Sequence, residues 1–113
     1  MRPPASLLRH LMLGADAPAP LTAQLRAAID QCPPSTLAAR MRAVLCVDVR
    51  AQVADLPMPI TAVVGTRDRL VPGPVAREPA LLARHGHVVT LDAPHLVLQR
   101  RPREVATLLA TLR

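Results

Sequence analysis

The stretch Ile60-Thr61-Ala62-Val63-Val64, which lies between Pro59 and Gly65, decides the fold class. It is a short apolar and partly β-branched run, which predicts a strand buried on both faces, as in a parallel sheet. A second run, His87-Val88-Val89-Thr90-Leu91, predicts another strand. Pro74 suits the first turn of a helix between the two strands that extends to about Arg84 and is followed by Gly86.

A last helix is predicted to start at Pro102. Its apolar residues recur at helical spacing and are Val105, Leu108, Leu109 and Leu112. The order strand, helix, strand, helix in so short a segment implies parallel strands joined by a right-handed crossover. Ligand sites in such sheets lie just past the carboxyl ends of the strands, which here means residues 65–72 and 92–97.

The residues before Pro57 predict helices only. We expect helices over residues 5–13, stopped by Gly14, and over residues 20–31, ended by Pro33. A third helix would be capped by Ser35 and a short fourth by Asp48, ending at about Ala54. The side chains expected to face inward from the first three are Leu7, Leu8, Leu11, Met12, Leu21, Leu25, Ala28, Ile29, Cys32, Leu37, Met41, Val44 and Leu45.

Composition excludes several classes of protein. The 113 residues suffice for a single small domain, and an apolar content of 50% excludes a disordered or fibrous chain. No apolar run approaches the roughly 18 residues of a membrane helix, and Arg9 and His10 interrupt the only candidate for a secretory signal. Cys32 and Cys46 are too few for a disulfide scaffold and are expected to be inert buried thiols. We therefore expect a cytoplasmic protein in a reducing setting.

Asp68 and His95 are the candidate catalytic residues. Asp68 follows the first predicted strand and His95 follows the second. Since the loops after two parallel neighbouring strands leave the sheet at one edge, these side chains are placed to meet. A carboxylate on one imidazole nitrogen fixes the tautomer and frees the other nitrogen as a general base. The pair would be the acid–base half of a nucleophilic triad.

Other interpretations of the polar residues remain open. Asp68 could instead be a loop aspartate paired with Arg67 or Arg69. Asp92 is a rival acid, although a turn role suits its place on the same loop as His95. The pair in His85-Gly86-His87 offers too few ligands for a metal site, so no metal is expected there.

These motifs, in this order, resemble the end of an α/β-hydrolase. In that family the penultimate core strand ends in a Gly-x-x-Asp-x-x-Val-Pro-like turn with the triad acid, as in residues 65–72 here. The last strand ends in a Gly-His or Pro-His pair with the triad base, as in Pro94-His95. Residues 99–105 resemble the closing helix. Residues 5–55 resemble the helical cap, and Asp48-Val49-Arg50-Ala51 resembles a step found in cap-containing serine carboxylesterases.

The resemblance implies an α/β protein with an incomplete α/β-hydrolase fold. Residues 1–56 would be a helical cap-like segment, and residues 57–113 the parallel βαβα part of the hydrolase core. The implied reaction is hydrolysis of a carboxylic ester or thioester, in which His95 takes a proton from a serine and Asp68 orients the imidazole. Haloperoxidases, dehalogenases and C–C bond hydrolases share the same frame. The resemblance implies neither a cofactor nor a metal.

The nucleophile that the resemblance calls for is missing from this sequence. The chain has two serines, Ser6 and Ser35, and neither stands in a G-x-S-x-G elbow. We therefore expect the C-terminal portion of a serine hydrolase, inactive alone. Its partners would be a small-molecule ester or thioester, in the complete protein, and the missing N-terminal half.

Two alternatives belong to other classes. The chain could be a non-catalytic interaction module with an inherited hydrolase sequence, or a basic binding protein that uses its net charge of +6. The basic cluster of Arg100, Arg101 and Arg103 is expected to be a solvated surface. Nucleic-acid-binding proteins usually add aromatic stacking, and this chain has no aromatic residue, so we expect neither a nucleic-acid nor a membrane partner.

Overall fold

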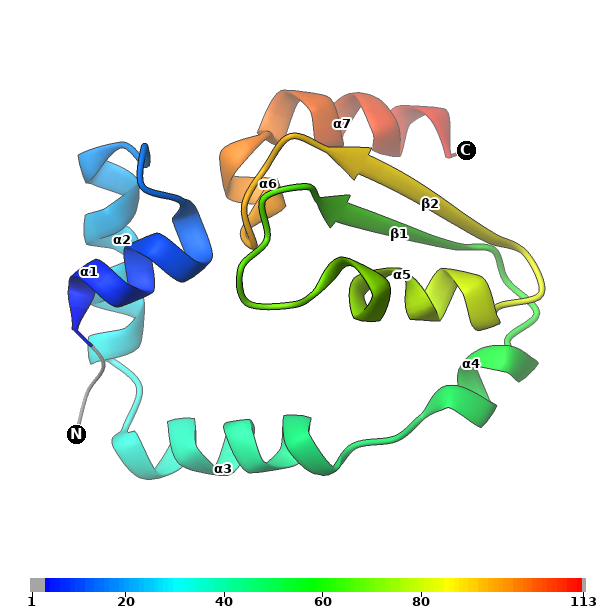
Figure 1. Ribbon diagram of the computed structural model, residues 1–113, viewed down its shortest axis with the longest axis horizontal. Helices are drawn as coiled ribbons and strands as arrows, with labels where there is room; N and C mark the ends of the chain where they lie inside the picture. Colours follow the sequence, from blue (N-terminus) through cyan, green and yellow to red (C-terminus); the bar gives the residue numbers. More distant parts are fainter. Residues whose placement is uncertain (1–3, 113) are drawn as a thin grey trace.

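The computed structural model describes residues 4–112 and contains a two-stranded sheet with helices around it (Figure 1). α5 and α7 lie on opposite sides of the strands, and α1 and α2 lie together beyond the ends of the strands. α3 runs separately along the bottom of the view in Figure 1, below α5. The elements are α1 (Ala5–Leu8), η1 (Arg9–Leu13), α2 (Ala19–Asp30), α3 (Pro34–Cys46), α4 (Arg50–Asp55), β1 (Ile60–Gly65), α5 (Gly73–Leu82), β2 (Gly86–Leu91), α6 (Val97–Arg100) and α7 (Pro102–Thr111).

The sheet confirms the predicted topology. β1 and β2 pair in parallel, in a register that runs from Ile60 opposite Gly86 to Gly65 opposite Leu91. Apolar, β-branched residues supply both strands, and α5 connects them across the sheet. The predicted order of strand, helix, strand, helix is therefore present, and the fold is an α/β unit preceded by helices.

The helix starts differ from the predictions in two places. α3 begins at Pro34, with Pro33 at the N-cap position, and Ser35 makes no capping hydrogen bond. Pro34 fixes the first helical turn one residue before Ser35, so the capping role predicted for Ser35 was wrong. Asp48 does accept a hydrogen bond from the Arg50 N–H, at 3.2 Å, but the N-cap residue of α4 is Val49.

One helical segment was not predicted, and the predicted helix over residues 5–13 is present but changes its geometry midway. The single turn α6 precedes α7 and is separated from it by Arg101, because Pro102 cannot continue an existing helix and starts a new one. The first helix is α-helical only as far as Leu8, and its second half, η1, has π-helical geometry. It ends as predicted at Gly14, whose φ of 85° is readily adopted only by glycine.

The buried apolar residues come from η1, β1, α5, the loop after β2 and α7. They are Leu13, Val64, Ala80, Ala93, Pro94 and Val105. The inward face predicted for α3 was wrong, since Met41, Val44 and Leu45 are 53%, 67% and 80% exposed. Cys46 is exposed and Cys32 only partly buried, so the burial predicted for these thiols was also wrong. Helical periodicity identifies an apolar face but not the element that covers it.

Gly65 lies where the chain after β1 approaches the chain after β2 most closely. The N–H groups of Thr66 and Arg67 donate to the carbonyls of Leu91 and Ala93, at 2.9 and 3.0 Å. A Cβ at position 65 would lie 2.6 Å from the carbonyl oxygen of Pro94 and would also meet that of Ala93. Only glycine therefore allows the two loops to hydrogen-bond to each other.

No helix among residues 4–112 has both the length and the apolar character needed to cross a membrane.

A substitution at Gly65 tests this close approach. We expect Gly65→Ala to lower the free energy of unfolding by about 2 kcal/mol or more, because two backbone carbonyls must move. Gly73→Ala is the matched control, since a Cβ at that position meets no atom within 4 Å, and it should change stability by less than about 0.5 kcal/mol. Urea denaturation followed by circular dichroism measures both. Equal effects of the two substitutions would contradict the steric argument.

Candidate active site

Asp68 is fixed by the turn that follows β1. Its backbone N–H donates to the Gly65 carbonyl at 3.2 Å, which closes the turn. Its side-chain Oδ1 accepts hydrogen bonds from the N–H groups of Leu70 and Val71, at 2.8 and 2.9 Å. An aspartate that bonds to the backbone two and three residues later is a common way to stabilise such a turn. The Asp68 side chain is consequently almost buried, at 9% exposure.

His95 is fixed by the loop that follows β2. Ala93 and Pro94, which precede it, are fully buried. The Leu96 N–H donates to the carbonyl of Met12 at 2.9 Å, and this bond joins the loop to the end of η1. The His95 backbone is thus held between the sheet and the N-terminal helices, and its side chain is 27% exposed.

The two candidate residues meet as the topology predicted. His95 Nδ1 lies 2.9 Å from Asp68 Oδ2, although 27 positions separate them in the sequence. A carboxylate only accepts hydrogen bonds, so the proton in this contact is on Nδ1, and the neutral ring then has its lone pair on Nε2. The arrangement leaves one imidazole nitrogen able to accept a proton from a neighbouring group.

The surroundings of Asp68 favour its ionised form. Burial alone would raise the pKa of the carboxyl, but hydrogen bonds from the Val71 N–H, from His95 and from the Leu70 N–H outweigh burial. The pKa of Asp68 therefore lies below its ordinary value of 3.8. The carboxylate remains charged at neutral pH and can stabilise a positive charge on the His95 ring.

Asp92, the rival acid, is not part of this pair. Its side chain is 71% exposed and forms an ion pair with Arg67, at 2.7 Å between Oδ1 and Nε. The Arg67 guanidinium is the main reason that the pKa of Asp92 lies below 3.8. The alternative pairing of Asp68 with Arg67 or Arg69 is likewise absent among residues 4–112. The Ala93 N–H donates to the Leu91 carbonyl at 2.8 Å, so Asp92 lies in a tight turn, as predicted, and its side chain adds an ion pair between the two loops.

His85 and His87 lie at the opposite edge of the sheet from His95. The carbonyl of His85 accepts the N–H of Ile60 at 2.9 Å, and His87 is opposite Thr61 in the register. Both belong to the end where the strands begin, as expected from their position before β2. No three His, Cys, Asp or Glu side chains in the described part of the chain gather closely enough to hold a metal ion.

Two cavities adjoin the pair, and each is lined by one of its two residues. A cavity of about 530 Å³ lies between η1, the Gly14 loop and the turn after β1, and we call it the interface cavity. Asp68 lines it, whereas His95 lines a second, more apolar cavity of about 260 Å³ together with Val63 and Val105. Pro94 rather than His95 lines the interface cavity beside the N-terminal helices.

An ion pair that the sequence analysis missed joins the helical segment to the sheet. Arg100 Nη2 lies 2.8 Å from Asp16 Oδ2, and the Arg100 side chain is 8% exposed. Arg67 also pairs with Asp16, at 3.6 Å. The solvated surface predicted for Arg100 was therefore wrong. No local signal could have identified this pair, because 84 positions separate the two residues.

Comparison with solved structures places this arrangement in a larger fold. The enol-lactonase from Burkholderia xenovorans LB400 superposes with a TM-score of 0.86 at 20% sequence identity, over 95% of this chain and 42% of its own. A hydrolase from Pseudomonas aeruginosa PA01 superposes with a TM-score of 0.74 at 28% identity, over 97% of this chain and 39% of its own. No protein-family model and no curated protein matches the sequence.

Both structures have the α/β-hydrolase fold. The present chain spans about two fifths of the length of each. The resemblance inferred from the motifs is thus confirmed at the level of the fold, and the chain has an incomplete α/β-hydrolase fold. The superposition extends over the helical segment and the βαβα unit together, so both parts have their counterparts in the larger structures.

The lowered pKa of Asp68 predicts an acid-sensitive loop. The folded chain stabilises the ionised form of Asp68. This contribution to the free energy of unfolding is complete above the pKa of the unfolded chain, near 4, and is lost as the pH falls through the lower pKa of the folded chain. We expect the free energy of unfolding to decrease below about pH 4, and to decrease less steeply in Asp68→Asn. Urea denaturation at a series of pH values measures both slopes.

Asp55→Asn is the control for this measurement, since Asp55 is 82% exposed and lies outside the site. Identical slopes for Asp68→Asn and the unchanged chain would show that Asp68 has no stabilised ionised form.

Proposed function

We propose that this chain provides the acid and base of a serine hydrolase that acts on carboxylic esters or thioesters. The observation that carries the proposal is the 2.9 Å hydrogen bond between His95 Nδ1 and Asp68 Oδ2, at the carboxyl edge of two parallel strands. In an α/β sheet this edge is where ligands bind. The fold shared with a hydrolase and an enol-lactonase supports the same conclusion.

The proposed mechanism follows from the atoms of this pair. His95 Nε2 would accept the proton of a serine hydroxyl as its oxygen attacks the carbonyl carbon of the ester. The ring then carries a positive charge, which the adjacent Asp68 carboxylate stabilises without taking the proton. His95 would return that proton to the departing alcohol or thiol, and would repeat the cycle with water to release the acid from the serine.

The nucleophile and the oxyanion-binding amides must come from residues outside this sequence. Ser6 belongs to α1 and Ser35 to α3, and neither hydrogen-bonds to His95. In an α/β-hydrolase these groups belong to an elbow and an earlier loop that this sequence lacks. We therefore propose that the active form includes a polypeptide segment that carries a G-x-S-x-G elbow.

Two surfaces of the chain support the need for such a segment. Within residues 4–112, β1 pairs with β2 only, which leaves its other edge open. Exposed apolar side chains lie along the second half of α3 and in the segment after it. They are Met41, Val44, Leu45, Val47 and Val49. Open strand edges and contiguous apolar surfaces are typical of regions that another part of a protein covers.

A chimaera tests the catalytic proposal. The N-terminal part of the Burkholderia enol-lactonase, up to its region of similarity, would be joined to residues 1–113 and assayed with p-nitrophenyl acetate. We expect hydrolysis by the chimaera and none by this chain alone. His95→Ala should reduce kcat by roughly 10⁴–10⁶-fold, and Asp68→Asn by about 10⁴-fold.

Asp55→Asn and His87→Gln are the matched controls, because they alter the same residue types away from the pair, and each should leave kcat within about threefold of the parent chimaera. Hydrolysis that survives His95→Ala would contradict the proposal. A folded but inactive chimaera would also count against it.

Because the second edge of β1 is unpaired within residues 4–112, we predict that this chain binds the N-terminal segment that carries the elbow. Co-expression of this chain with the same N-terminal part, as separate polypeptides, should give a complex that elutes as one species in gel filtration. Val63→Pro removes a backbone donor from β1 and should abolish the complex. Gly73→Pro changes the first residue of α5, where proline is favoured and a Cβ meets no atom within 4 Å, and should leave the complex intact. Complex formation by the Val63→Pro chain would exclude β1 as the contact.

A further inference from the structure

The interface cavity contains one positive charge that no carboxylate of residues 4–112 neutralises. Arg67 pairs with Asp92 at 2.7 Å and with Asp16 at 3.6 Å. Asp68 is occupied by two backbone N–H groups and by His95. Arg69, in the same wall, has no ion pair within the described chain. Its guanidinium is the unpaired charge of the cavity.

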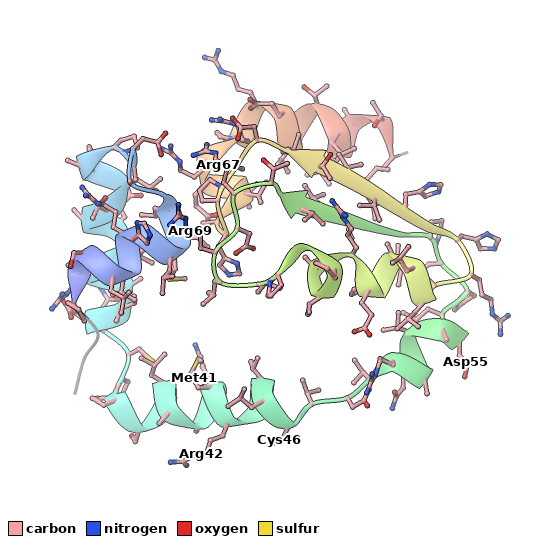
Figure 2. All side chains as sticks on the ribbon, viewed as in Figure 1. Met41, Arg42, Cys46, Asp55, Arg67 and Arg69 are labelled. Atoms are coloured by element: carbon pink, nitrogen blue, oxygen red, sulfur yellow. The ribbon has the colours of Figure 1, made fainter. Side chains whose placement is uncertain are left out.

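Arg69 is oriented by a neutral partner. Its Nη1 lies 2.7 Å from Nε2 of His10, a residue of η1. Figure 2 shows Arg69 extending from the turn after β1 to the N-terminal helices. A guanidinium can only donate hydrogen bonds, so Nε2 of His10 accepts and the ring is neutral, with its proton on Nδ1. One donor of Arg69 is used in this contact, and its other N–H groups remain available to a ligand.

We propose that the interface cavity is a subsite for a carboxylate group of the substrate, bound by Arg69. This inference rests on the proposed function and specifies it: the substrate would be an ester or thioester with a free carboxylate. Asp68 lines the cavity and hydrogen-bonds to His95, so the anionic group would bind next to the residue that supports the imidazole. A volume of about 530 Å³ is ample for a short carboxylic acid.

The charges in the wall favour a carboxylate over a phosphate. The planar guanidinium matches the two oxygens of a carboxylate in a paired arrangement of hydrogen bonds. Asp16 and Asp68 lie in the same wall, and their negative charges repel a doubly charged phosphate more strongly than a singly charged carboxylate. A single unpaired arginine is therefore suited to a monoanion.

Equilibrium dialysis of the full chain tests the subsite without requiring turnover. The probes are monomethyl glutarate, which has one ester and one carboxylate, dimethyl glutarate, which is its neutral counterpart, and methyl phosphate. We expect saturable binding of monomethyl glutarate, at least about tenfold tighter than that of dimethyl glutarate, because a charge-assisted hydrogen bond is lost in the neutral probe. Arg69→Gln should weaken binding of monomethyl glutarate by about tenfold or more.

Arg84→Gln is the matched control, since Arg84 is an exposed arginine that pairs with Asp55 away from the cavity, and it should leave binding unchanged. His10→Gln retains a hydrogen-bond acceptor for Arg69 and should bind monomethyl glutarate better than His10→Leu. The circular dichroism spectra of all variants establish that they are folded. If a variant does not fold, the binding of the two glutarate esters to the unchanged chain still tests the carboxylate subsite.

Equal binding of the two glutarate esters, or equal binding by Arg69→Gln and the unchanged chain, would overturn the proposal. Tighter binding of methyl phosphate than of monomethyl glutarate would overturn the choice of a carboxylate. His95→Ala should retain binding of monomethyl glutarate while it abolishes hydrolysis by the chimaera. Failure of the carboxylate subsite is thereby distinguished from failure of the catalytic proposal.

Discussion

At Gly65 two backbone segments lie so close together that no side chain fits between them. The hydrogen bonds from Thr66 and Arg67 to the carbonyls of Leu91 and Ala93 extend the pairing of the strands past the end of the sheet. This extension fixes the start of both loops, so Asp68 and His95 are brought together at one end of the sheet. The geometry of the candidate site follows from this contact between backbones rather than from an attraction between the two side chains.

The N-terminal helices depend on the same edge of the sheet. Leu13 is fully buried there, which contributes about 1.5–3 kcal/mol relative to exposure. The bond from Leu96 to Met12 and the ion pair of Arg100 with Asp16 hold the same helices to the loop after β2. Arg100 Nε is buried without a partner among residues 4–112, so the ion pair fixes position more than it adds stability. By contrast, the apolar face of α3 remains exposed.

The candidate site divides its functions between neighbouring residues of one turn. Asp68 is turned inward by its bonds to Leu70 and Val71, and it supports His95. Arg69 extends the other way to His10, and Arg67 joins the turn to Asp92. Three consecutive charged residues thus have three different partners. The neutral imidazole of His10 orients Arg69 without cancelling its charge, which a carboxylate in the same place would do.

The sequence by itself determined the strands, their parallel pairing, the order of the helices and the meeting of Asp68 with His95. These follow from local hydrophobic patterns and from the rule that loops after parallel strands share one edge. The division at residue 57 and the catalytic roles remain predictions. Only the tertiary structure decided that Arg100 is buried, that α3 is exposed, that His95 faces the second cavity and that His10 holds Arg69. Each of these depends on contacts between distant segments, and local periodicity carries no information about which distant segment covers a given side chain.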